Sequence, residues 1–188
     1  MDLILKVRRR FFKKNMATNL PPNPTTRKVT NLENAKSVGI LFDATDPENR
    51  QTVADFAAKL ARSGKKARLL GFVNLPEKKA PTDLPFVHFN KKTVNWYGRP
   101  VGEKAEAFCK EKFDLLLCLF SGENRPLEWL AARSSARMKA GGSLHFYKNL
   151  DMTIEIAPGK ELSELISQLE FYFKRLVVAE QRAMAMAE

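Results

Sequence analysis

Eight basic residues lie within the first 28 positions, where Asp2 is the single acidic residue. This segment therefore carries +7 of the total formal charge of +11. Ammonium and guanidinium groups at such density favour a polyanionic partner, because phosphates that pair with them release their counterions. The alternative is a segment that only improves solubility. The basic residues are Lys6, Arg8, Arg9, Arg10, Lys13, Lys14, Arg27 and Lys28.

A second set of candidate residues mixes cations with aromatic rings. The segment 91–99 reads KKTVNWYGR, and we expect Lys91, Lys92, Trp96, Tyr97 and Arg99 to contribute to binding. Aromatic rings stack on unpaired bases while neighbouring cations contact phosphates. The alternative is that the two rings anchor a long loop to the core.

Arg133 and Arg137 form a third candidate pair, four residues apart, and we expect them to share one face near the end of a helix. Cations at a helix C-terminus are also favoured by the helix dipole, so this pair is equally compatible with a structural role.

Residues suited to catalysis are scattered. The sequence has no G-x-G-x-x-G, G-x-S-x-G or G-x-x-x-x-G-K-[ST] motif. Its two histidines, His88 and His145, stand among aromatic residues, and Cys109 and Cys118 form no CxxC pair. Asp43 and Asp46 could hold a metal, but turn formation and helix capping are the simpler roles for them. We therefore expect no enzyme activity, no catalytic residues, no metal and no cofactor.

Local patterns predict the elements that must position these residues. Residues 1–16 show helical spacing, with Leu3, Ile4, Val7 and Phe11 on one face and Lys6, Arg9, Arg10 and Lys13 on the neighbouring face. The prolines of residues 17–30 predict a semi-rigid linker. We expect a basic N-terminal helical arm and linker over residues 1–31, an α/β domain over 32–182 and a frayed tail over 183–188.

Within the domain, apolar runs alternate with amphipathic stretches. This alternation is typical of a three-layer α/β fold with a mostly parallel, flavodoxin- or Rossmann-like sheet. Expected helices run from Pro47 to Gly64, from Glu103 to Phe113, from Pro126 to Gly141–Gly142, and from Glu161 to about Gln181. Expected strands are Ser37–Asp43, Ala67–Val73, Phe86–Phe89, Asp114–Phe120, Ser143–Tyr147 and Met152–Ile156.

Three segments and the closing amphipathic helix carry a family resemblance. SVGILFD at 37–43, NWYGR at 95–99 and FDLLLCLF at 113–120 resemble a family of small α/β proteins from Bacteroidota that is a domain of unknown function. The resemblance spans most of residues 30–180. It implies the α/β fold, and it implies neither an activity nor a set of site residues.

The composition of the chain argues against a membrane-spanning protein and against a secreted one. Hydrophobic residues make up 44% of the chain, enough for a folded core, but no apolar run approaches the length needed to span a bilayer. The order of basic and apolar residues at the N-terminus differs from that of a secretion signal, and two isolated cysteines fit a reducing cytoplasm.

The favoured hypothesis is a cytoplasmic RNA-binding protein associated with the ribosome, in contact with ribosomal RNA and with ribosomal proteins. In its narrowest form, this hypothesis is a lineage-specific ribosomal protein. The alternatives are a module that binds a protein or small ligand, a peripheral membrane protein held by the N-terminal helix, and an enzyme whose site the motifs do not reveal.

Overall fold

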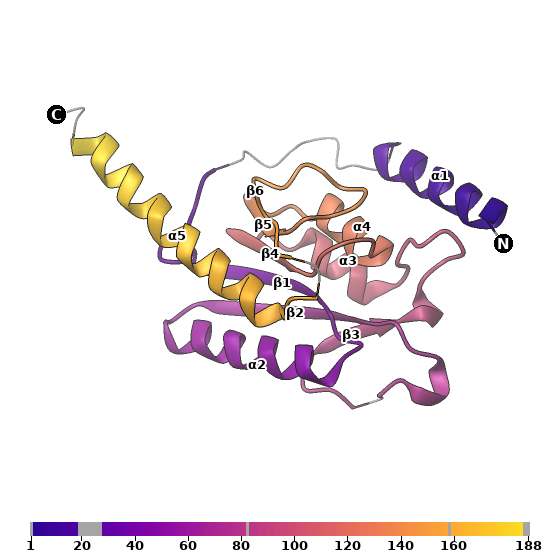
Figure 1. The fold of residues 1–188 in the computed structure, drawn as a ribbon. Helices are drawn as coiled ribbons and strands as arrows, with labels where there is room; N and C mark the ends of the chain where they lie inside the picture. Colours follow the sequence, from indigo (N-terminus) through magenta and orange to yellow (C-terminus); the bar gives the residue numbers. More distant parts are fainter. Residues whose placement is uncertain (1, 19–27, 82, 158, 186–188) are drawn as a thin grey trace.

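Six parallel strands form one central sheet in the order β3-β2-β1-β4-β5-β6. The computed structural model describes residues 2–18, 28–81, 83–157 and 159–185 (Figure 1). Because every pair of neighbouring strands is parallel, the expected α/β fold is confirmed. The strands are β1 (Ser37–Asp43), β2 (Lys66–Val73), β3 (Val87–Asn90), β4 (Leu115–Leu119), β5 (Met138–Gly142) and β6 (Met152–Ile154).

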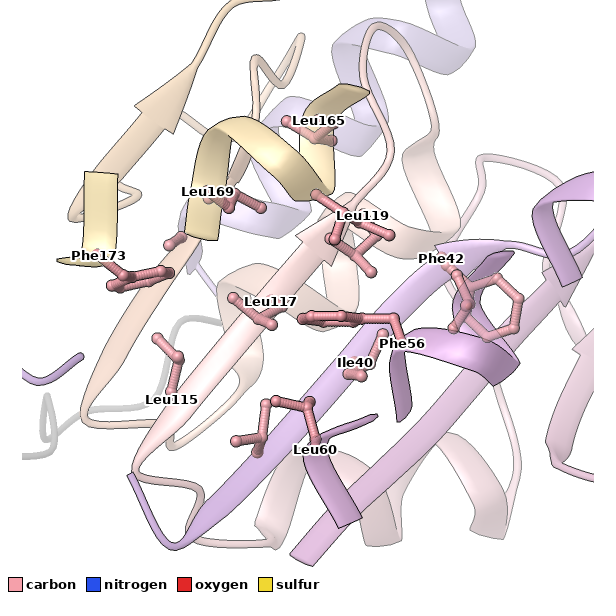
Figure 2. Close-up of a cluster of buried hydrophobic side chains, with 14 of the residues drawn as sticks. Ile40, Phe42, Phe56, Leu60, Leu115, Leu117, Leu119, Leu165, Leu169 and Phe173 are labelled. Atoms are coloured by element: carbon pink, nitrogen blue, oxygen red, sulfur yellow. The ribbon is translucent and has the colours of Figure 1, made fainter. Parts of the chain in front are cut away.

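Helices cover both faces of the sheet. On one face, α2 (Pro47–Arg62) and α5 (Leu162–Ala185) bury Phe56, Leu169 and Phe173 against alternate residues of β1 and β4 (Figure 2). On the other face, α3 (Glu103–Lys110) and α4 (Arg125–Arg133) bury Phe108 and Leu130 against the intervening residues. A strand buried on both sides must be apolar throughout, which explains the unbroken run LLLCL of β4.

The first crossover, from β1 to β2, forms as the sequence predicts. The carboxylate of Asp46 accepts a hydrogen bond from the backbone N–H of Glu48 and caps α2, with Pro47 in the first turn. Gly64 follows the helix with a φ of +75°, a left-handed conformation that glycine adopts at little cost. These two signals place both ends of α2 correctly.

The segment from Pro126 to Tyr147 differs from the prediction. The expected helix to Gly141–Gly142 is wrong: α4 ends at Arg133, and residues 138–142 form β5. The expected strand Ser143–Tyr147 is also wrong, because this segment is irregular and pairs through a single isolated bridge at Leu144. The two glycines are needed for close strand packing. A Cβ at Gly141 would lie 2.2 Å from the carbonyl oxygen of Cys118, and one at Gly142 would lie 2.4 Å from that of Phe120.

The helix α3 is also shorter than expected, because it ends at Lys110 instead of Phe113. The chain is already extended at Glu111, and the ring of Phe113 fills the space above Gly39 of β1, where a Cβ would approach it to 2.8 Å. Two short 3-10 turns, Glu77–Lys79 and Lys91–Thr93, complete the connections.

A further helix, α1 (Asp2–Thr18), packs on the outside of α4. It forms the helix expected over residues 1–16, but as an additional layer over the domain (Figure 1). Phe12 is 0% exposed and its ring lies 5.9 Å from that of Trp129 and 5.1 Å from that of Phe146. Most of the predicted linker, residues 19–27, lies outside the described residues.

Candidate nucleic-acid interface

Because α1 packs on the domain, its basic residues differ in their contacts and in their exposure. Arg9 lies on the side that faces the domain and forms an ion pair with Glu123, which follows β4. The hydrogen bond and charge of Glu123 raise the pKa of the Arg9 guanidinium. Arg9 therefore adds a surface contact between α1 and the domain, and its charge is balanced by Glu123.

A cationic stripe lies on the outer side of α1. Lys6, Arg10 and Lys14 follow one another at intervals of four residues, so they share one side of the helix, and all three are exposed. Within the described part of the chain they have no ion-pair partner. Lys13 lies next to the stripe and places its Nζ 5.6 Å from the centre of the Phe146 ring. The cationic stripe is thus free to meet an external anion.

An apolar stripe runs beside the cationic one. Ile4 is 65% exposed, Val7 41% and Phe11 46%, whereas the side chain of Leu3 lies outside the described residues. The face that packs on the domain is formed by Phe12 and Met16 instead. The predicted apolar face of this helix therefore points away from the core, which leaves an apolar surface next to the cations.

The loop 91–99 lies beside this helix. The side-chain oxygen of Asn95 accepts hydrogen bonds from the backbone N–H groups of Gly98 and Arg99, which closes the loop into a tight turn. Tyr97 packs into the cluster around Phe12, whereas Trp96 is 53% exposed. Tyr97 thus anchors the loop, whereas Trp96 is exposed and its stacking on a base stays a prediction.

Trp96 and α1 meet around one cavity. The rings of Phe11 and Trp96 lie 5.1 Å apart. A cavity of about 500 Å³ opens here, where the ends of β1 and β2, the loop 91–99 and the start of α4 come together. Its walls include Arg8, Asn74, Lys91, Trp96 and Arg125. Arg8 therefore lines the same cavity as Lys91 and Trp96, from which it is far apart in sequence.

Lys92 is exposed in the same loop, but Arg99 is directed inward. Its guanidinium carbon lies 5.3 Å from the centre of the Trp129 ring, and its Nε is buried without a hydrogen-bond partner among the described residues. Arg99 and Arg133 line a separate cavity of about 290 Å³ between α3 and α4. These two residues do not join the surface around Trp96.

Arg133 and Arg137 do not share a helix face, since α4 ends at Arg133 and Arg137 immediately precedes β5. Arg137 forms a 3.3 Å ion pair with Asp114, and its carbonyl accepts a hydrogen bond from the backbone N–H of Lys28. Burial raises the pKa of Asp114, but hydrogen bonds from Ser37 and Lys36 and the charge of Arg137 lower it by more. These basic residues lie where strands begin, away from the cavity, and Arg27 lies outside the described residues.

Two features of the interface were missed from the sequence. Phe12 is the residue that holds α1, although its helical spacing from Met16 could have indicated a second apolar face. Arg125 enters the cavity because α4 begins there, and no local pattern in the sequence distinguishes this arginine from other surface cations.

The acidic residues after β1 form turns and caps, as the simpler interpretation predicts. The carboxylate of Asp43 accepts hydrogen bonds from the backbone N–H of Thr45 at 2.9 Å and from the side-chain amide of Asn124 at 3.1 Å. On the opposite side of these residues, a second crevice of about 410 Å³ is lined by Asp46, Glu48, Glu161 and other polar groups.

The two histidines and the two cysteines lie on four different segments of the chain. His88 is in β3 and His145 is exposed beside Phe146, whereas burial raises the pKa of Cys109 to about 11 and that of Cys118 to about 12. Among the residues that the structure describes, no three His, Cys, Asp or Glu side chains are grouped so that they could hold a metal ion.

Burial also raises the pKa of Glu128 in α4, although backbone N–H groups of Tyr147, Phe146 and Asn124 oppose the shift by donating hydrogen bonds to its carboxylate. This carboxylate fixes the segment that follows β5, and Phe146 in that segment contacts Phe12. Glu128 therefore supports the docking of α1 indirectly.

Comparison with known proteins places the chain in a family. No curated protein matches it. In the described part of the chain, no helix combines the length and the apolar character that crossing a membrane requires. A family model matches residues 8–176, a range that takes in most of α1 and the whole sheet. The chain belongs to this family of unknown function, DUF6913.

Proposed function

We propose that the protein is a non-enzymatic RNA-binding protein of the cytoplasm that associates with the ribosome. The observation that supports this proposal best is the cationic stripe of Lys6, Arg10 and Lys14 on α1, the same helix from which Arg8 lines a cavity together with Lys91 and Trp96. A row of cations can contact successive phosphates, and an exposed aromatic ring such as Trp96 can stack on a base.

The apolar stripe beside these cations favours a ribosomal location over free RNA. Ile4, Val7 and Phe11 are exposed, although an interface with RNA alone would leave them without apolar contacts. A ribosomal surface offers RNA and protein side by side, so it supplies phosphates for the cationic stripe and apolar side chains for the apolar stripe. The resemblance to Bacteroidota proteins extends the proposal to a lineage-specific ribosomal component.

Salt dependence of RNA binding tests the proposal. Neutralising the cationic stripe with Lys6→Gln, Arg10→Gln and Lys14→Gln removes up to three phosphate contacts. The slope of log affinity against log salt should then fall by roughly 2 for a single-stranded RNA, at about 0.7 per contact. Neutralisation is preferable to deletion of residues 1–28, because deletion would also remove the buried Phe12.

A matched control changes the same charge elsewhere. Arg62 ends α2, Lys66 begins β2 and Lys112 lies in the loop that precedes β4; all three residues are exposed. Their triple glutamine variant should bind RNA with nearly the native slope. Equal slopes for the two triple variants would show that the affinity depends on net charge alone, and the proposed interface would be rejected.

Membrane-surface binding is the second candidate, because exposed Ile4, Val7 and Phe11 next to cations also suit an anionic bilayer. Flotation with vesicles that contain phosphatidylserine separates the two. Binding to vesicles that is lost in Phe11→Asp would favour the bilayer. RNA binding with no flotation at physiological salt would favour the proposed function.

A further inference from the structure

Three kinds of chemical group line the cavity beside Trp96: cations, an aromatic ring and a carboxylate. Arg8 from α1 and Lys91 from the loop supply cations at its rim, Trp96 supplies an aromatic surface, and Asp43 supplies a carboxylate at the end of β1. It lies next to the boundary between β1 and β4, where the strand order reverses direction. In open parallel sheets this boundary is the usual place for a ligand.

The balance of charge in the cavity favours an anionic group near Arg8 and Lys91. Neither side chain has an ion-pair partner among the described residues. The acidic Glu123 in the same wall is already paired with Arg9 and lies 3.5 Å from the Nε of Arg125. Helix α4 also begins in this wall, and its N-terminus adds a partial positive charge.

Asp43 requires a different kind of partner. The donors that its carboxylate binds, the N–H of Thr45 and the amide of Asn124, are both neutral, so its charge is not compensated. A ligand group that approaches Asp43 should donate a hydrogen bond, as a sugar hydroxyl or a base amino group does.

The indole of Trp96 is available for stacking. Its ring planes make angles of 61° with Phe11 and 84° with Tyr97, so neither neighbour lies flat against it. A planar heterocycle can therefore lie against the exposed indole. An anion, a planar ring and hydrogen-bond donors occur together in a ribonucleotide.

We propose that this cavity binds one unpaired ribonucleotide of a bound RNA, with its base on Trp96, its phosphate at Arg8 and Lys91, and a hydroxyl or amino group at Asp43. The inference rests on the proposed function and adds that the protein selects single-stranded over duplex RNA. In a duplex the bases stack on each other, and they cannot reach an indole without being extruded.

The test compares a single-stranded RNA of about 12 nucleotides with the same sequence in a duplex, at one salt concentration. The native protein should prefer the single strand by roughly 10-fold or more, the scale that stacking of one base supplies. Trp96→Ala should remove this preference and Trp96→Phe should keep most of it. Phe171→Ala is the matched control, because Phe171 is similarly exposed but lies on α5.

Failure of this inference is distinct from failure of the proposed function. If the protein binds RNA with a steep salt dependence, but Trp96→Ala binds the single strand as tightly as the native protein does, the cavity does not hold a base and the proposed function stands. The same holds if duplex and single strand bind equally. If the protein binds no RNA at low salt, both proposals are wrong.

Discussion

Phe12→Ala should release α1 from the domain. Phe12 is 0% exposed and contacts Trp129 and Phe146, whereas the other contacts of the helix are the partly buried Met16 and groups at the surface. Truncation of a buried Phe to Ala costs about 3–5 kcal/mol. A loss of this size exceeds what the remaining contacts of one peripheral helix supply, and an isolated helix of 17 residues is only marginally stable in water.

Tryptophan fluorescence reports this release directly, because the two tryptophans of the chain, Trp96 and Trp129, both contact α1. In Phe12→Ala the emission should shift to longer wavelength as Trp129 becomes hydrated, and the amides of α1 should lose protection from hydrogen exchange. Amides of β1 and β4 should stay protected, since the sheet does not depend on Phe12.

Ile4→Ala is the matched control, because Ile4 lies on the same helix and is 65% exposed, and its effect on both signals should be small. If Phe12→Ala left the emission and the protection of α1 unchanged, Phe12 would not be the residue that holds the helix. If it instead unfolded the sheet, α1 would be an integral part of the cooperative core.

Three further predictions concern the stability of the domain. Gly141→Ala should lower the free energy of unfolding in urea by about 3 kcal/mol or more, because its Cβ would meet the rigid backbone of β4. Gly122 has open space around it, so Gly122→Ala should cost about 1 kcal/mol, and similar costs for the two variants would contradict this packing. Asp114→Asn should lower the stability of the domain at neutral pH. The difference from the native protein should vanish as the pH falls through the pKa of Asp114 in the folded state, because that pKa lies below the value in the unfolded state. A stability difference that does not change with pH would contradict the lowered pKa of Asp114. Arg99→Met should change stability by no more than about 1 kcal/mol, because the loss of the contact with Trp129 is offset by the removal of a buried donor that has no partner among the described residues. A larger loss would show that the guanidinium has a stabilising partner.

Much of the fold could be predicted from the sequence because β1, β2 and β4 are apolar runs and α2 carries its own capping signals. These features are local, and local patterns are what a single sequence displays. The pair Gly141–Gly142 misled the prediction because glycine serves both as a helix stop and as a residue for close strand packing. Only the neighbouring backbone of β4 decides between these two roles.

The candidate site was predicted only in part, because its residues meet through tertiary structure. The basic segment and Trp96 were identified by residue type, but the sequence could not show that Arg8 and Lys91 line the same cavity. The inward direction of Arg99 depends on Trp129, which is distant in sequence. The order of the strands, which sets the edge where these segments converge, depends on the crossovers and is not encoded by any single motif.

Co-sedimentation with ribosomes tests the central proposal most directly. The native protein should travel with ribosomal particles through a sucrose gradient at low salt, and high salt should release it. The variant with Lys6, Arg10 and Lys14 changed to Gln should stay at the top of the gradient, whereas the control with Arg62, Lys66 and Lys112 changed to Gln should sediment with the particles. If the native protein stayed at the top of the gradient at low salt, the ribosomal role would be contradicted.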